Sequence, residues 1–168
     1  MIERGIMAVI ASPKVALERA SETRDYEKAL DIQRASASRT YAAYVKEDDL
    51  RYLFRKGTIS LIKVGEEVVG LVAFLPDKEH RNLVELTNLA ILPSYKRNGF
   101  GSEAWGLQLE ELASQGFEYA WGVVHPDNKN SRDILKKSGF EYAGRADNYY
   151  GDGEPRLILE KSLIRGKD

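Results

Sequence analysis

The sequence contains no cysteine, and this absence excludes disulfide bonds, thiolate metal sites and a cysteine nucleophile. Histidine is almost as scarce, since His80 and His125 are the only two and cannot form a zinc site by themselves. Neither sign of charge prevails, because 25 Lys and Arg residues stand against 26 Asp and Glu residues. A net charge of -1 gives no overall field to attract nucleic acid or an anionic membrane, so any anion site must be local.

Long apolar runs are also missing. No stretch approaches the roughly 18 to 20 continuous apolar residues that a membrane-spanning helix needs. The apolar run at residues 7–11 is shorter than the core of a signal peptide, so we expect a cytoplasmic protein. No repeat or linker of Pro, Gly and Ser divides the chain, and 168 residues with 43% hydrophobic content suit a single domain covering residues 1–168.

The hydrophobic pattern predicts a mixed α/β chain. Runs rich in β-branched or alternating residues predict strands at residues 15–19, 58–64, 67–75, 83–92, 117–124, 140–145 and 156–161. Helical spacing predicts helices at residues 26–33, 50–54, 105–113 and 130–137. Gly65 and Glu66 suit a type II′ hairpin turn, and the polar pair Thr87 and Asn88 predicts a bulge. This order predicts hairpins at both ends of a β-α-β core.

The loop at residues 92–102 joins a predicted strand to a predicted amphipathic helix. A helix N-terminus presents unpaired amides with about half a positive charge, and Gly99 and Gly101 would let a ligand approach the backbone closely. Lys96 and Arg97 add local positive charge. These features favour a phosphate site. The competing interpretation is that the glycines only start a helix on a tight turn while both basic side chains stay solvated.

A dinucleotide fingerprint is a second alternative for this loop. Gly99, Gly101 and Ala104 satisfy G-x-G-x-x-A, and Asp127 stands near the spacing of a ribose-binding acid. The fingerprint needs its first glycine directly at the strand end, whereas here a basic loop led by Pro93 intervenes. Too little chain follows for a doubly wound second half, so we disfavour this alternative.

The pattern Lys96-x-x-Gly99-x-Gly101 resembles the pyrophosphate loop Arg/Gln-x-x-Gly-x-Gly/Ala of the GNAT acetyltransferase superfamily, with lysine as a mild departure. The resemblance covers about residues 58–163. It implies a twisted mixed central sheet of about six to seven strands flanked by about four helices. It also implies acetyl-CoA as acyl donor, without a metal. The implied coenzyme-binding residues are Lys96, Arg97, Asn98, Gly99, Phe100, Gly101 and Ser102 in the loop, and Leu89, Ala90 and Ile91 on the preceding strand.

A second segment, residues 125–140, resembles the other signature of the family. Its Asn128 matches an asparagine that touches the coenzyme at the start of a helix, and Gly139 and Phe140 match the end of that helix. A helix cap is the alternative role of Asn128, and one amide group can fill both roles. Many members carry a tyrosine acid seven residues after this asparagine. Here Leu135 occupies that position, so the acid is absent.

Three residues are candidates for catalysis. Glu85 lies in an otherwise apolar strand, and a partly buried carboxylate could take the proton that an amine with a pKa of about 10 must lose before attack. A surface ion pair with a lysine is the alternative for Glu85. Ser131 together with Leu135 resembles the Asn-x-x-Ser arrangement of enzymes that acetylate protein N-termini. Tyr149 and Tyr150 resemble a Tyr-Tyr hairpin that lines the peptide entry of such enzymes, where either tyrosine could position the acceptor or replace the missing acid. Ordinary hairpin residues would give the same letters. We interpret His125 as a strand-end polar residue rather than a base.

These observations predict direct transfer of an acetyl group from acetyl-CoA to a primary amine, which could be a peptide N-terminus, a lysine or a small molecule. No nucleic acid or membrane partner is expected. The alternative is a non-catalytic acyl-CoA-binding sensor or interaction domain, which would be consistent with Leu135. The residues do not determine the oligomeric state, and a homodimer stays open.

Overall fold

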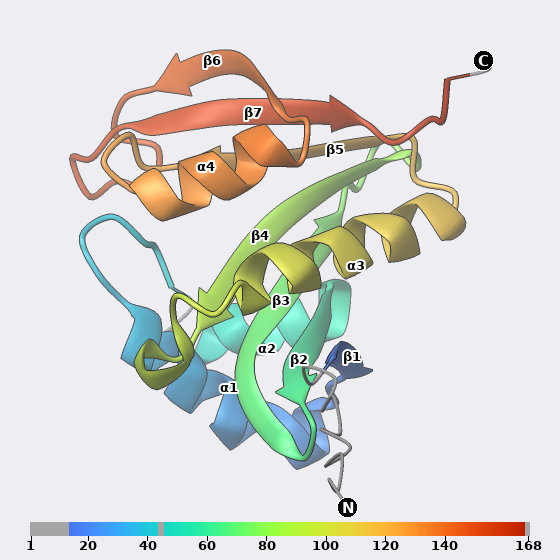
Figure 1. Cartoon of the computed structure of the whole chain (residues 1–168). Coiled ribbons are helices and arrows are strands. Elements are labelled where there is room, and N and C mark those ends of the chain that lie inside the picture. The colour runs from blue at the N-terminus through green and yellow to red at the C-terminus, as the bar shows by residue number, and fades with distance from the viewer. Residues whose placement is uncertain (1–13, 44–45, 167–168) are drawn as a thin grey trace, which may run out of the picture.

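The computed structural model describes residues 14–43 and 46–166, and within them it shows one seven-stranded sheet flanked by helices (Figure 1). The strands are β1 (Val15–Arg19), β2 (Thr58–Val64), β3 (Glu67–Pro76), β4 (Leu83–Ile91), β5 (Tyr119–Val124), β6 (Glu141–Ala146) and β7 (Arg156–Ser162). The α-helices are α1 (Glu22–Ser36), α2 (Glu47–Lys56), α3 (Phe100–Ser114) and α4 (Lys129–Lys137). The predicted elements are confirmed, with ends shifted by a few residues. The apolar run at residues 7–11 lies outside the described residues.

The strand order β1-β2-β3-β4-β5-β7-β6 places one parallel pair, β4 and β5, inside an otherwise antiparallel sheet. Helix α3 connects these two strands, which gives the predicted β-α-β core with hairpins on either side. The hairpin of β2 and β3 turns at Gly65, whose φ of +61° suits the first central position of a type II′ turn. A doubly wound dinucleotide fold is therefore excluded, because such a fold needs a mainly parallel sheet.

The predicted bulge lies in β4. Ala73 of β3 pairs with Asn88 and Phe74 pairs with Leu86, so Thr87 has no partner in this ladder. The extra residue reverses which face the following side chains reach. Leu86 packs into the cluster under α3 and α4, whereas Ala90 packs into the cluster under α1 and α2. The bulge thus separates the part of β4 that faces the second of these clusters from the part that faces the first.

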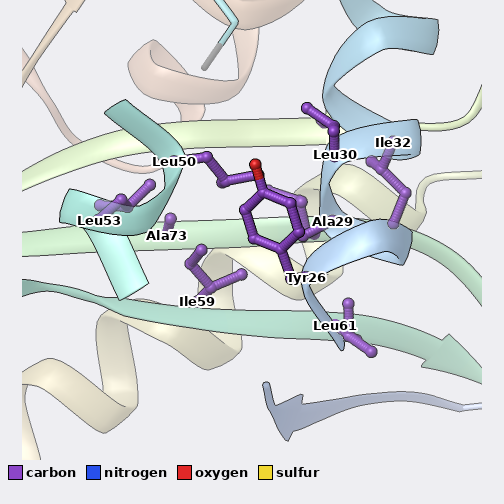
Figure 2. Close-up of a cluster of buried hydrophobic side chains, with 11 residues drawn as sticks. Tyr26, Ala29, Leu30, Ile32, Leu50, Leu53, Ile59, Leu61 and Ala73 are labelled. Carbon is purple, nitrogen blue, oxygen red and sulfur yellow. The ribbon is translucent and has the colours of Figure 1, made fainter. Parts of the chain in front are cut away.

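Each face of the sheet carries its own pair of helices. Figure 2 shows the first cluster, in which Tyr26 and Ala29 of α1 and Leu50 and Leu53 of α2 lie over Ile59, Leu61 and Ala73 of the sheet. The second cluster joins α3 and α4 to β4, β5 and β7 through Trp105, Leu112, Leu135 and Phe140. Strands β4 and β5 separate beyond their paired residues, and the space between them borders this second cluster.

Replacing Leu50 with alanine should lower the free energy of unfolding by about 2 to 5 kcal/mol, because the side chain is fully buried and its loss leaves a cavity. Lys56→Ala on the same helix is the matched control, since Lys56 is exposed and should change stability by less than about 0.5 kcal/mol. Urea denaturation followed by circular dichroism measures both. Equal losses for the two variants would mean that α2 does not pack on the sheet as described.

Candidate active site

The loop between β4 and α3 folds as a compact turn that leaves its amides free. It begins with a short 3-10 turn, Pro93–Tyr95, which the sequence analysis did not predict. The Tyr95 hydroxyl donates to Glu67 at 2.9 Å, and the Asn98 Nδ2 donates to the carbonyls of Tyr95 and Lys96, so the turn is braced from both sides. Arg97 and Gly99 have φ of +67° and +76°, which turns the chain sharply into the helix.

Within the part of the chain that the structure describes, the amides of residues 97–102 donate no hydrogen bond. They surround the N-terminus of a 15-residue helix, where the backbone dipoles favour negative charge. The side chains of Lys96 and Arg97 are exposed beside them. This arrangement suits a phosphate or diphosphate group.

The two glycines have different reasons to be there. Gly99 needs its left-handed φ, whereas Gly101 is an ordinary helical residue at which alanine would be more stable by about 1 kcal/mol. A Cβ on Gly101 would meet Ile91, Ile134 and Leu89 at ordinary contact distances of 3.5 to 3.8 Å, so protein packing does not require glycine. The Cβ position of residue 101 thus lies between the end of β4 and α4.

Strand β4 parts from β5 after three of its nine residues. The two strands pair at Leu83, Val84 and Glu85, and from Leu86 onward the edge of β4 that faces β5 has no strand partner among residues 14–43 and 46–166. Leu89, Ala90 and Ile91 lie on this unpaired stretch. A cavity of about 60 Å³ occupies the gap, and its lining includes Leu86, Thr87, Asn88, Trp105, Leu135 and Tyr150.

Glu85 occupies the last paired position, opposite Trp121 of β5 and Leu75 of β3. Its carboxylate is half-buried and has no hydrogen bond or ion pair within residues 14–43 and 46–166, so the alternative of a lysine partner is not observed. Burial raises the pKa of Glu85 above that of an ordinary glutamate, and the negative charge of Asp77 adds to this. Such a carboxyl group is a better proton acceptor than an exposed one.

Tyr149 and Tyr150 lie together in the connection between β6 and β7. Their rings meet edge to face with centroids 4.8 Å apart, and the Arg156 guanidinium lies 5.1 Å from the ring centre of Tyr150. Burial raises the pKa of Tyr149, and the charge of Glu85 adds to this, which places Tyr149 near Glu85. Tyr150 lines the cavity. The structure therefore brings both tyrosines to the region around Glu85 and the parted strands.

Asn128 is the N-cap of α4. Its Oδ1 accepts the Ser131 amide at 3.2 Å, while its Nδ2 donates to the Thr40 carbonyl at 3.3 Å, so the predicted cap is confirmed. A contact of Asn128 with a coenzyme stays a prediction. Ser131 and Leu135 follow on the helix face that lines the cavity.

The connection between α1 and α2 supplies contacts that the sequence analysis missed. Arg39 forms ion pairs with Asp127 at 2.9 Å and with Glu154 at 3.2 Å. His125 is buried; its Nδ1 accepts the Asp127 amide at 3.0 Å, so its Nε2–H donates to Glu154 at 2.7 Å. His125 is thus a structural residue at the end of β5, as interpreted. No local sequence pattern predicts these contacts, because Asp127 lies 88 positions and Glu154 lies 115 positions after Arg39 in the chain.

No group of three His, Cys, Asp or Glu side chains among the described residues could hold a metal ion. In the described part of the chain, no helix is long and apolar enough to cross a membrane.

Free amides at a helix N-terminus beside a parted strand pair suit a ligand that carries a diphosphate group. Comparisons with known proteins identify the class of protein. The model of the acetyltransferase (GNAT) family matches residues 20–140 of the chain. The ribosomal protein S18-alanine N-acetyltransferase of Escherichia coli superposes with a TM-score of 0.76 at 18% identity, covering 92% of this chain and 97% of that one. An acetyltransferase of Bacillus subtilis in complex with CoA gives 0.75 at 18% identity, covering 90% and 100%.

A similar relative by sequence is the ribosomal protein bS18-alanine N-acetyltransferase of Haemophilus influenzae, which is 35% identical over 65 residues. That match spans 39% of this chain and 44% of the relative. Because the family model covers most of the sequence, the chain belongs to the acetyltransferase (GNAT) family. The resemblance seen in residues 96–101 and the predicted mixed α/β fold are thereby confirmed.

Proposed function

We propose that this chain transfers an acetyl group from acetyl-CoA directly to a primary amine. The observation that carries the proposal is the row of unpaired amides at residues 97–102, which lies directly beyond the unpaired edge of β4. The amides would hold the diphosphate, with Lys96 and Arg97 nearby. The pantetheine arm would follow Leu89, Ala90 and Ile91, whose free backbone groups could pair with its amides.

The chemistry follows from the position of Glu85. An ammonium group cannot attack a thioester, and a primary amine is mostly protonated at neutral pH, with a pKa of about 8 for a peptide N-terminus and about 10 for an alkylamine. The half-buried carboxylate would take this proton, directly or through one water molecule. An unpaired amide of β4 at the thioester oxygen would stabilise the tetrahedral intermediate, as donors in other acyl-transfer sites do by roughly 3 kcal/mol.

We propose a peptide N-terminus as the acceptor. Tyr150 and residues 40–42 of the α1 to α2 connection line the cavity beside the parted strands. Tyr149 packs on Tyr150, and the charge of Glu85 contributes to its raised pKa. The Haemophilus influenzae relative, which acts on the alanine of a ribosomal protein, supports the same class of acceptor. A cytoplasmic location and a homodimer stay predictions.

A thiol-release assay with three acceptors tests this proposal: a peptide with a free N-terminus, its N-acetylated form with an internal lysine, and a small alkylamine. We expect release of CoA thiol only with the free N-terminus. If only the lysine peptide or only the alkylamine were acetylated, the acceptor would be a lysine side chain or a small amine instead of a peptide N-terminus. Binding of acetyl-CoA without turnover on any acceptor would favour the acyl-CoA sensor, which the buried Leu135 at the usual position of the acid makes the second candidate.

Replacing Tyr149 with phenylalanine should raise the KM for the peptide about fivefold and leave the KM for acetyl-CoA unchanged. The raised pKa of Tyr149 keeps its hydroxyl protonated at neutral pH, so it can donate a hydrogen bond to the acceptor near Glu85. Tyr142→Phe in β6 is the matched control, because Tyr142 is 66% exposed and lies outside the site. Steady-state kinetics with the peptide varied would contradict this role if both variants behaved alike.

A further inference from the structure

Leu135, at the usual position of the acid, gives the leaving group no partner. Leu135 is buried, lines the cavity between the parted strands and carries no group that could donate a hydrogen bond. When the carbon-sulfur bond of a thioester breaks, the electron pair stays on sulfur as a thiolate. In an apolar cavity such an anion needs a donor close to it. The inference below rests on the proposed acetyl transfer, since only that reaction creates the thiolate.

Trp105 of α3 supplies a donor of the right kind. The side chain is 5% exposed and lines the same cavity as Leu135. Its Nε1 is fully buried and has no hydrogen-bond partner within the described residues. The ring stacks at an angle on Phe140, with centroids 6.0 Å apart, and belongs to the same apolar cluster as Leu86 and Leu135. A buried N–H without an acceptor is costly, so a site that retains one calls for an explanation.

We propose that the indole N–H of Trp105 donates a hydrogen bond to the sulfur of the coenzyme as the acetyl group departs. Glu85 takes one proton from the ammonium group, and the free amine nitrogen then attacks the carbonyl carbon. The tetrahedral intermediate collapses, the carbon-sulfur bond breaks, and the electron pair goes to sulfur. Trp105 keeps its proton, because an indole N–H does not ionise near neutral pH. The nitrogen releases its second proton as the amide forms, and the thiolate, whose thiol has a pKa of about 8.5 in solution, takes up a proton through water.

Two other buried polar atoms in this cavity fit the role less well. The Asn88 Oδ1 is also without a partner, but an amide oxygen can only accept a hydrogen bond. The hydroxyl of Thr87 is unpaired as well and can donate, yet Thr87 sits on the bulge of β4 rather than in the apolar cluster with Leu135. Thr87 therefore provides the comparison variant for Trp105.

Nuclear magnetic resonance tests the contact directly, because the chain has only two tryptophans and hence two indole N–H signals. The full chain labelled with ¹⁵N is titrated at pH 9 with CoA, which then carries a thiolate, and separately with desulfo-CoA. We expect the indole proton of Trp105 to move downfield with CoA and to stay near its free position with desulfo-CoA. Trp121 of β5 is the internal reference and should respond alike to both.

The outcomes separate this inference from the proposed function. Movement of the backbone amides of Gly99 and Gly101 with both compounds, together with an equal response of the Trp105 indole, would overturn the hydrogen bond to sulfur and leave acetyl transfer intact. No movement of those amides with either compound would instead remove the coenzyme site itself.

Kinetics provide the second arm. Trp105→Phe keeps an aromatic ring against Phe140 and should lower kcat about tenfold, the effect of one lost hydrogen bond at the leaving group, with the KM for acetyl-CoA within about twofold. Thr87→Val should lower kcat less than Trp105→Phe does. A larger loss in Thr87→Val than in Trp105→Phe would transfer the role to Thr87. If Trp105→Phe does not fold, the indole signals of the native chain still decide.

Discussion

Replacing Gly101 with leucine should raise the dissociation constant of acetyl-CoA at least about a hundredfold. Leucine is a good helix former, so α3 should still begin at Phe100. Its Cβ would fit against Ile91 and Ile134, but the rest of the side chain would extend from between β4 and α4 toward the proposed place of the pantetheine arm along Leu89, Ala90 and Ile91. A hundredfold loss corresponds to about 2.7 kcal/mol of binding free energy. Isothermal titration calorimetry with acetyl-CoA measures it.

Two variants serve as controls for this result. Gly106→Leu places the same side chain on the same helix, where an added Cβ meets no atom within 4 Å, and should leave affinity unchanged. Lys96→Ala removes one exposed charge and should weaken binding less than tenfold, because the backbone amides provide most of the grip. If Lys96→Ala raised the dissociation constant more than Gly101→Leu, the proposal that main-chain amides bind the diphosphate would be wrong.

Replacing Glu85 with glutamine should lower turnover about a hundredfold at neutral pH and leave the affinity for acetyl-CoA unchanged. The substitution keeps the shape of the side chain and removes its ability to accept a proton, which is the size of effect expected of a general base. Stopped-flow or steady-state thiol release gives turnover, and calorimetry gives affinity. Unchanged turnover would remove Glu85 from the mechanism.

The pH profile sharpens the test of Glu85. Burial raises the pKa of this carboxyl group, so the unmodified protein should lose activity as the pH falls through that raised pKa, at a higher pH than for an ordinary glutamate. In Glu85→Gln this limb should be absent, and the rate should rise with the fraction of free amine up to about pH 8, near the pKa of a peptide α-amino group. The deficit is therefore largest near neutral pH and shrinks in alkaline solution.

Glu160→Gln is the matched control for Glu85→Gln. Glu160 pairs with the other side of Trp121 on β7, but it is exposed and outside the gap between the parted strands. Its removal changes the net charge by the same amount while leaving the proposed base in place. An equal loss of turnover in both variants would mean that charge near Trp121, rather than proton transfer, explains the effect.

The local pattern of the sequence predicted much of this molecule. Local sequence predicts three features: the two-residue turn at Gly65, the bulge at Thr87 and the glycine turn at residues 99–101. Each depends on backbone conformation and side-chain alternation, which are short-range properties. The same is true of Asn128, whose capping bond reaches only three residues ahead. Residues 96–101 therefore indicated the family before any strand order was known.

Other features depend on how distant segments meet in the tertiary structure. Nothing near Glu85 in the chain shows that it lacks a partner, and nothing near Tyr149 shows that it lies beside that carboxylate. The unpaired N–H of Trp105 and the ion pairs of Arg39 are equally invisible in the sequence. The sequence by itself determined the elements and the turn that we propose binds phosphate, since these form from residues close in the chain. Only the folded sheet decided where β4 leaves β5 and which polar groups meet in that gap, because burial and pairing depend on segments far apart.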